Sequence, residues 1–266
     1  MIELGKKQTL LIVKSVEFGV YLAEDMNADT KHQVLLPAKQ VPAGTKAGDK
    51  LEVFIYKDSQ DRLIATTNEP LLMVGQAGLL KVKQVTRIGA FLDWGLEKNI
   101  LLPYKEQTTH VNQGEEYLVA LYIDRSNRLA ATMKVSRYLT TTDKYVKDSA
   151  VSGTVIGIKP DHGIYVAIDD AYYGFITRNE MSDDIKIGDV VYGRVIKVRE
   201  DGKLTISIHQ KAYLQMDEDS VRIYDALVKN GGSLGFNDKA DPEIIKKHFD
   251  MSKNAFKRAV GRLLKE

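Results

Sequence analysis

The sequence has 266 residues, which favours two to four compact units over a single small domain. Hydrophobic residues make up 44%, enough for each unit to build a core, and the absence of cysteine excludes disulfides, thiolate zinc sites and thiol catalysis. The formal net charge is only +2, so any binding to nucleic acid must come from local patches or from stacking.

From the N-terminus, one ordered pattern occurs three times. Each copy has a glycine inside a strand, then a short apolar strand, a Gly-acid turn that opens a long strand, and a basic residue that opens the last strand. In chain order the glycine motifs are Phe18–Leu22, Ile88–Leu92 and His162–Val166, the short strands are Val34–Pro37, Ile100–Pro103 and Gly174–Thr177, the turns are Gly48–Asp49, Gly114–Glu115 and Gly188–Asp189, and the basic residues are Arg62, Arg128 and Lys203.

The spacing supports a true repeat. The short strand and the turn glycine are 11 residues apart in every copy, and the basic residue follows after 14, 14 and 15 residues. Polar turn sequences separate these strands, and five short strands per copy suit a small closed barrel of the oligonucleotide-binding (OB) type. We therefore expect OB-fold repeats over residues 1–69, 70–142 and 143–213, with a four-residue insertion in the first copy around Asn27–His32.

After about Tyr213 the apolar spacing becomes helical. The sequence predicts a helix over Asp217–Lys229, a short strand over Ser233–Phe236, a helix that begins at Pro242 after the cap Asp241, and a helix opened by Ser252 with Phe256, Val260, Leu263 and Leu264 inward. This order is that of a winged helix-turn-helix, and we assign it residues 214–266. The sequence stops at Glu266, before the usual β-hairpin, so we expect either that the wing is missing or that the module is a reduced one.

Candidate nucleic-acid contacts come first from aromatic residues. The residue two positions after each repeat glycine is Tyr21, Phe91 or Tyr165. Because successive side chains of a strand face opposite ways, the flanking apolar residues take the core and the ring takes the outer face. An outward ring can stack on a base, although it can also pack against a neighbouring domain. Phe18 and His162, next to the glycine, can stack in the same way.

Basic residues supply the second set of candidates. Arg62 and Arg128 begin the last strands, where they can neutralise phosphate or can simply be solvated. The second copy has the most basic outer strand, with Lys81, Lys83 and Arg87.

The last predicted helix offers a separate face. Asn254, Lys257 and Arg258 lie away from the Phe256/Val260 stripe, and in a helix-turn-helix this face enters a groove of DNA. A solvated basic face is the alternative interpretation.

The sequence does not suggest an enzyme, a metal site or a cofactor. Its histidines, His32, His110, His162, His209 and His248, have no metal-ligand spacing, and no phosphate-cradling glycine loop is present. Residues 1–30 contain no signal peptide, and no stretch reaches the roughly 20 apolar residues of a membrane span. We expect a cytoplasmic protein without catalytic residues or membrane contact.

The repeat elements resemble the RNA-binding repeat named after bacterial ribosomal protein S-one. The third copy, with Gly163–Val166 and Gly174–Ile176, is the nearest match, and Phe175 of that motif joins the candidate RNA contacts. Three such repeats and a winged helix are similar to the conserved virulence factor B family of Gram-positive bacteria. That resemblance implies RNA binding and an influence on gene expression.

Some family positions are changed in this sequence. The single repeats usually end the third strand with a His, where this chain has Pro37, Pro103 and Thr177. The turn Asp before the last strand is kept as Asp58 and Asp124 but replaced by Arg199. These departures favour multivalent binding, because several weak sites on short linkers can gain about 10²–10⁴ in avidity.

The resulting hypothesis is a post-transcriptional regulator that binds single-stranded, mRNA-like RNA across several barrels. A DNA-binding regulator led by the last helix and a protein-interaction scaffold with degenerate barrels are the alternatives. The sequence does not give the oligomeric state.

Overall fold

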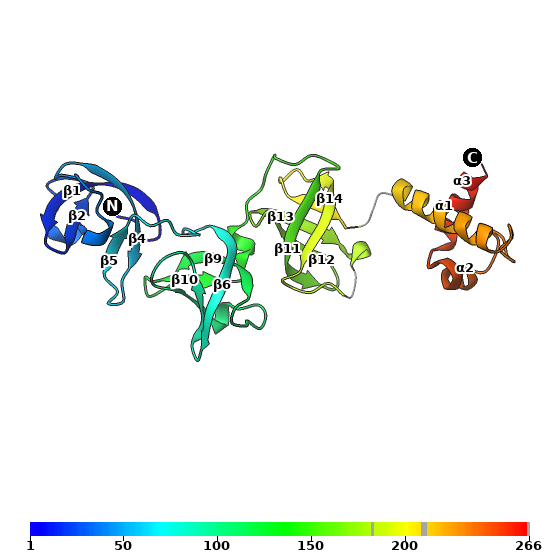
Figure 1. Cartoon of the computed structure of the whole chain (residues 1–266), viewed down its shortest axis with the longest axis horizontal. Coiled ribbons are helices and arrows are strands. Elements are labelled where there is room, and N and C mark those ends of the chain that lie inside the picture. The colour runs from blue at the N-terminus through cyan, green and yellow to red at the C-terminus, as the bar shows by residue number, and fades with distance from the viewer. Residues whose placement is uncertain (182–183, 209–211, 265–266) are drawn as a thin grey trace. The chain divides into compact units, whose positions relative to one another are not determined.

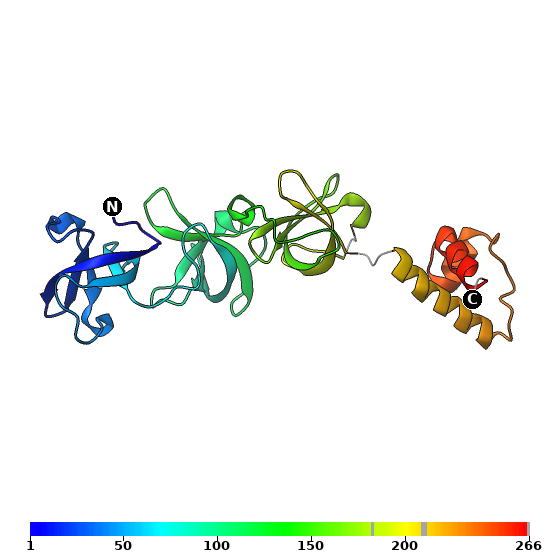
Figure 2. The ribbon, with the colours of Figure 1, turned by 90° about the horizontal axis from the view of Figure 1, so that it is seen from above.

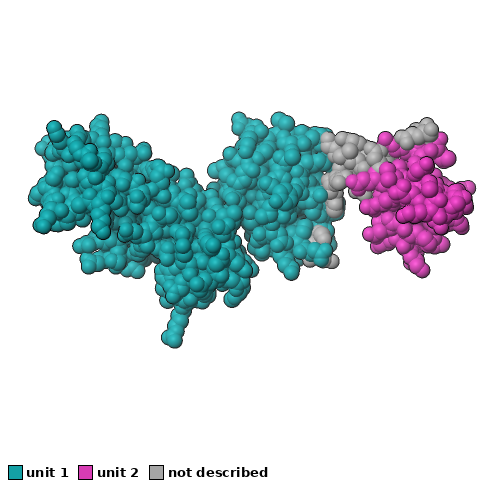
Figure 3. Space-filling model, viewed as in Figure 1, with its two compact units in different colours: residues 1–208 teal, residues 209–266 magenta. Residues whose placement is uncertain are grey.

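The computed structural model describes residues 1–181, 184–208 and 212–264, with backbone alone for residues 212–217. The chain forms two compact units, residues 1–208 and 209–266 (Figure 3). His209 and Glu266, which entered the sequence predictions, lie outside the described residues.

The first unit contains three five-stranded barrels in tandem (Figures 1 and 2). The first is built from β1 (Lys7–Val16), β2 (Gly19–Ala23), β3 (Val34–Pro37), β4 (Lys50–Lys57) and β5 (Leu63–Thr66), the second from β6 (Ala77–Thr86), β7 (Gly89–Asp93), β8 (Ile100–Pro103), β9 (Glu116–Ile123) and β10 (Leu129–Thr132), and the third from β11 (Ala150–Lys159), β12 (Gly163–Ile168), β13 (Tyr172–Thr177), β14 (Val190–Val198) and β15 (Leu204–Ser207). Short 3-10 turns connect the strands at Thr30–His32, Ala38–Gln40, Tyr104–Glu106, Val135–Tyr138 and Arg178–Glu180.

All three barrels share one topology. The first and third close in the order β1-β2-β3-β5-β4 and β11-β12-β13-β15-β14. The second has the order β10-β9-β6-β7-β8, and β8 lies beside β10, so this barrel is nearly closed. The predicted fold class, mainly β with tandem five-stranded barrels and a helical C-terminal module, is confirmed.

The repeat glycine is required by a close approach of two strands. Gly19, Gly89 and Gly163 have φ between 144° and 152°, and a Cβ on any of them would lie 2.1–2.3 Å from a carbonyl oxygen of the third strand. Only glycine fits there. Each first strand also carries a bulge opposite the following aromatic, where the register shifts between Ile12 and Lys14 and at the matching positions of β6 and β11. A bulge bends a strand, which helps a short sheet to close.

Apolar contacts also join the barrels of the first unit. In β4 four successive residues, Val53–Tyr56, are buried, because Val53 and Ile55 face the first barrel's core while Phe54 and Tyr56 join the core cluster of the second. Their rings lie 5.7 and 6.4 Å from that of Trp94. In the second barrel, Leu118 and Ala120 of β9 pack with Ala167 of the third.

Over its described residues, 212–264, the second unit forms three helices, α1 (Ala212–Lys229), α2 (Pro242–Phe249) and α3 (Lys253–Leu263). The predicted caps are confirmed: Asp241 accepts from the N–H of Glu243 at 2.9 Å, and Ser252 accepts from that of Ala255 at 3.2 Å. The core is formed by Ile223, Ile245, Met251, Phe256 and Ala259.

Three details of the helical prediction were wrong. The first helix begins at Ala212, before the predicted start at Asp217. No strand forms over Ser233–Phe236, where Gly235 adopts a left-handed φ of 52° and no partner strand exists among the described residues of this unit. Leu264 does not point inward but is 82% exposed, since it is the C-cap of α3.

Candidate nucleic-acid interface

Each barrel carries an aromatic side chain on the outer face of its second strand. Val20 and Leu22 are buried in the core while Tyr21 between them is half-buried, and the same alternation holds around Phe91 and Tyr165. The three rings are thus neither fully exposed nor covered. Across the ladder they face Leu35, Leu101 and Phe175 respectively. The repeat therefore builds three similar apolar patches, each flanked by the residue before the glycine.

The flanking residues extend two of these patches. Phe18 is 58% exposed, and its ring meets that of Tyr21 edge-on at 6.4 Å. In the third barrel the rings of Tyr165 and Phe175 lie 5.4 Å apart, and the Lys159 ammonium sits 5.4 Å from the Tyr165 ring centre. His162 is exposed beside them. A cation next to two rings suits an anionic, stackable ligand such as a nucleotide.

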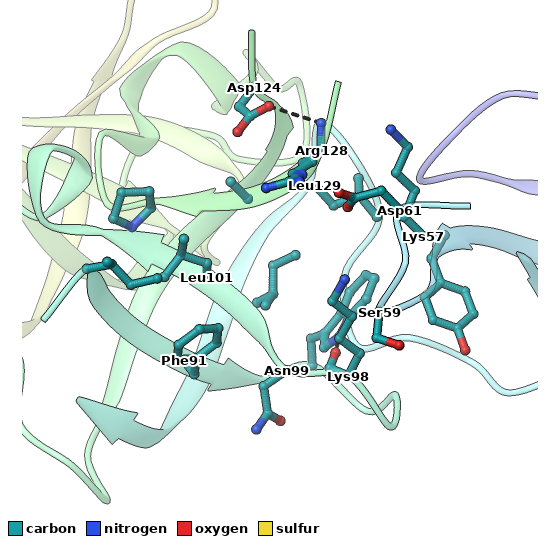
Figure 4. Close-up of a pocket in the computed structure, with 16 residues that line it drawn as sticks. Lys57, Ser59, Asp61, Phe91, Lys98, Asn99, Leu101, Asp124, Arg128 and Leu129 are labelled. Atoms are coloured by element: carbon teal, nitrogen blue, oxygen red, sulfur yellow. Dashed lines mark hydrogen bonds and ion pairs between the residues drawn. The ribbon is translucent and has the colours of Figure 1, made fainter. Parts of the chain in front are cut away.

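In the second barrel the patch becomes a pocket of about 310 Å³ (Figure 4). Phe91 and Leu101 lie on one side of it, and Lys57 and Ser59 of the first barrel lie on the other. The remaining lining residues are Tyr56, Asp61, Ile88, Trp94, Lys98, Asn99, Ile100, Pro103, Asp124, Arg128, Leu129 and Ala130. Residues of the β4–β5 turn of the first barrel, Lys57, Ser59 and Asp61, line one edge of this pocket.

The arginines predicted to meet phosphate are already paired. The Arg62 guanidinium binds Asp58 in its own turn, with its Nε 2.9 Å and its terminal nitrogen 2.7 Å from Oδ2. Burial opposes ionisation of Asp58, but hydrogen bonds from Arg62 and from the backbone hold its pKa below the ordinary value. Arg128 forms an ion pair with Asp61 of the first barrel. To bind a phosphate, Arg62 or Arg128 must give up its present carboxylate partner.

The basic strand of the second barrel shows the same pairing. Lys81, Lys83 and Arg87 are exposed as predicted, but the Lys83 ammonium lies 3.0 Å from Asp93. A hydrogen bond from the N–H of Gly95 and the nearby Lys83 lower the pKa of Asp93, so the carboxylate stays ionised. These residues lie on β6 and its turn and do not line the Phe91 pocket.

Residues of the first barrel's turn were not among the sequence predictions. Lys57, Ser59 and Asp61, together with Lys98 and Asn99 of the second barrel, line the pocket. Lys98 donates to the backbone oxygen of Asp58 at 2.9 Å. The sequence held one indirect signal, the unbroken apolar run Val53–Tyr56, which is typical of a strand buried on both faces.

The basic face of α3 is a separate candidate site. Asn254, Lys257 and Arg258 are all exposed, while Phe256 and Ala259 are buried against the other helices. The structure thus leaves the predicted face accessible in the second unit.

Nothing in the described part of the chain marks a metal centre or a membrane span. No group of three or more His, Asp or Glu side chains there is placed to hold an ion. None of the helices described combines the length and the apolar character that a bilayer crossing requires.

Comparisons with known proteins place the chain in a family. A model of the S1 domain matches residues 4–68 and again residues 74–134. The second domain of the virulence regulatory factor CvfB matches residues 135–210, and a CvfB-like winged helix domain matches residues 221–266.

Relatives cover most of the chain. Conserved virulence factor B of Staphylococcus saprophyticus is 32% identical over 82% of this chain and 76% of its own length. The uncharacterized protein YitL of Bacillus subtilis is 30% identical over 98% of this chain and 89% of its own. A crystal structure of a multidomain protein with nucleic acid binding domains from Streptococcus pneumoniae is 25% identical, with a TM-score of 0.50 over 98% of this chain and 93% of that one. The chain belongs to the conserved virulence factor B family.

Proposed function

We propose that this protein binds single-stranded RNA across several of its barrels and acts on gene expression after transcription, in the cytoplasm and without enzymatic activity of its own. The observation that carries the proposal is the threefold recurrence of a half-exposed ring, Tyr21, Phe91 or Tyr165, on the outer face of the second strand. A core alone does not require a ring at that position, since the side chain points away from it.

Stacking is the interaction that this geometry suits. A base on an aromatic platform contributes roughly 1–3 kcal/mol and needs no sequence match. Unpaired bases can reach a ring on a strand face, whereas bases within a duplex are covered by their neighbours, so single strands are the preferred form. The basic residues add modest support, because Arg62, Lys83 and Arg128 already have carboxylate partners.

The comparisons support the same class of ligand. Two barrels match the S1 domain, and the related pneumococcal protein is described as a multidomain protein with nucleic acid binding domains. The match of residues 135–210 to the second domain of a virulence regulatory factor supports a regulatory role.

The test is a titration of labelled single-stranded RNA against the wild type and a Tyr21/Phe91/Tyr165 triple alanine variant. We expect the variant to lose at least tenfold in affinity, since each ring lost costs roughly 1–3 kcal/mol per base. Tyr192→Ala is the matched control, because Tyr192 is 74% exposed on β14, outside the three patches. Equal affinity of the triple variant and the wild type would remove the rings from the binding site. No RNA binding even at low salt would favour a protein-interaction scaffold.

Duplex DNA is the second candidate ligand. The exposed Asn254, Lys257 and Arg258 on α3, in a region that matches a winged helix domain, favour it. Competition between single-stranded RNA and duplex DNA for the protein distinguishes the two candidate ligands. If DNA displaces RNA only weakly and Lys257→Ala/Arg258→Ala leaves RNA affinity unchanged, the barrels are the primary site.

A further inference from the structure

The turn between β4 and β5 of the first barrel is fixed at the edge of the second barrel's face. Asp58 holds the turn closed by accepting the N–H groups of Gln60 and Arg62 at 2.8 and 3.0 Å. Two contacts then tie it to the second barrel: Lys98 donates to the Asp58 carbonyl, and Arg128 pairs with the Asp61 carboxylate. The turn is thus part of the wall around Phe91.

The repeats themselves show what is special about Asp61. The residue before the basic residue of the last strand is Asp61 in the first barrel, Asn127 in the second and Gly202 in the third, and all three have positive φ, at 62°, 57° and 73°. Asp, Asn and Gly all tolerate this conformation, so the turn alone does not demand an acid. Only the copy that reaches a neighbouring arginine carries one. In the third barrel, Lys203 pairs instead with Asp201 of its own turn at 3.2 Å.

The pocket beside Phe91 is large enough for one nucleotide. At about 310 Å³ it lies at the lower end of the range for small-molecule sites. Phe91, Ile88 and Leu101 contribute apolar side chains to the lining, and Asn99 and Ser59 offer hydrogen-bonding groups for the edge of a base. Lys57, Lys98 and Arg128 add three cationic side chains to the lining. A guanidinium binds carboxylate and phosphate in the same forked geometry, so Asp61 occupies the place on Arg128 that a phosphate would take.

We propose that the second barrel and the β4–β5 turn of the first together form a single-nucleotide subsite, in which an RNA phosphate competes with Asp61 for Arg128 while its base stacks on Phe91. This subsite rests on the proposed RNA binding. It adds a site shared by two barrels, base contacts from Asn99 and Ser59, and a carboxylate of the protein, Asp61, that competes with the RNA phosphate. Both ion-pair partners are partly exposed, with 58% of the Arg128 and 38% of the Asp61 side chain accessible, so the exchange needs no unfolding.

Trp94 allows the subsite to be observed directly. It is the only tryptophan of the chain, it lines the pocket, and it is otherwise buried against Phe54 and Tyr56. Its emission can be followed while a short labelled oligouridylate is added to the full chain, and the anisotropy of the label reports total RNA binding in the same sample. We expect the Trp94 emission to change with the same midpoint as the anisotropy.

The variant that tests the competitor is Asp61→Asn, which keeps the side-chain size and the tolerance of positive φ. Surface ion pairs contribute about 0.2–1 kcal/mol, so its removal should tighten RNA binding roughly 1.4- to 5-fold. Glu52→Gln is the matched control, because Glu52 is exposed on β4 of the same barrel, loses the same charge and does not line the pocket. Adding Arg128→Gln to Asp61→Asn should abolish the gain.

Each outcome of these experiments supports or contradicts a stated part of the proposal. If RNA raises the anisotropy but leaves the Trp94 emission unchanged, the subsite is wrong and the proposed function stands. If Asp61→Asn and Glu52→Gln shift affinity equally, Asp61 is not a competitor. If RNA does not bind at all, the proposed function fails and this inference fails with it.

Discussion

Replacing the repeat glycine of the second barrel tests the principle on which the three barrels are built. Gly89 has φ 145°, and a Cβ there would lie 2.3 Å from the carbonyl oxygen of Leu102 and 2.9 Å from the Cα of Pro103. Both neighbours are backbone atoms, so neither can move aside as a flexible side chain would. Gly89→Ala therefore meets two costs, an unfavourable φ and a steric overlap.

Gly114 of the same barrel separates these two costs. Its φ is also positive, at 89°, but a Cβ there would meet no atom within 4 Å. A sparsely populated backbone conformation costs about 1–3 kcal/mol, and forcing extra atoms into a packed site adds about 1–3 kcal/mol. We expect Gly114→Ala to lower the free energy of unfolding by roughly 1–3 kcal/mol and Gly89→Ala by roughly 2–6 kcal/mol.

Urea unfolding followed by Trp94 emission measures both variants, because this single tryptophan is buried in the second barrel. Domains are stable by only about 5–15 kcal/mol, so a loss at the upper end of the range expected for Gly89→Ala would bring a barrel of low stability close to unfolding. Equal losses for the two variants would show that steric overlap with the third strand is not what requires the glycine.

Three further predictions concern packing, capping and charge. Phe54→Ala should lower the free energy of unfolding of the first unit by about 3–5 kcal/mol, because it removes the ring that packs against Trp94 and leaves a cavity. A loss of unfolding free energy below about 1 kcal/mol, obtained from circular-dichroism melting, would contradict this. Asp241→Ala should cost the second unit about 0.5–2 kcal/mol through loss of the α2 cap, measured by helix melting, whereas Asp238→Ala should be close to neutral. Burial raises the pKa of Asp170 above its ordinary 3.8. The folded state is therefore not destabilised by this group below pH 3.8, and it loses stability as the pH rises through the raised pKa of the folded protein. Asp170→Asn should therefore be more stable than the wild type at neutral pH but not in acid, which urea midpoints at both pH values can check.

Features set by local geometry could be predicted from the sequence. The alternation around Tyr21 follows from the two-residue period of a strand, and the caps Asp241 and Ser252 follow from the unpaired N–H groups at helix starts. The repeat made these predictions stronger, because each pattern occurs with fixed spacing in three copies.

Contacts between copies could not be predicted in the same way. Arg128 and Asp61 are 67 residues apart, and no local pattern indicates that the turn of one barrel reaches the face of the next. The run Val53–Tyr56 indicates a strand buried on both sides but does not identify its partner. The strand expected over Ser233–Phe236 failed for a related reason, since a strand needs a partner that the local sequence does not provide.

Pairing of basic side chains with carboxylates in all three barrels affects the strength and the salt dependence of binding. Arg62, Lys83, Arg128 and Lys203 each lie within 3.5 Å of a carboxylate, so a phosphate that binds one of them displaces an anion held within the protein instead of only a solvent ion. Binding through such groups gains less from counterion release than binding to a free basic patch. Where the cations are paired in this way, stacking has to supply most of the affinity, and the roughly 1–3 kcal/mol of a single ring falls short of the roughly 4 kcal/mol that even millimolar binding requires. High affinity therefore requires several barrels to bind one strand together, and the tandem arrangement in one chain raises the effective concentration of each face for the next.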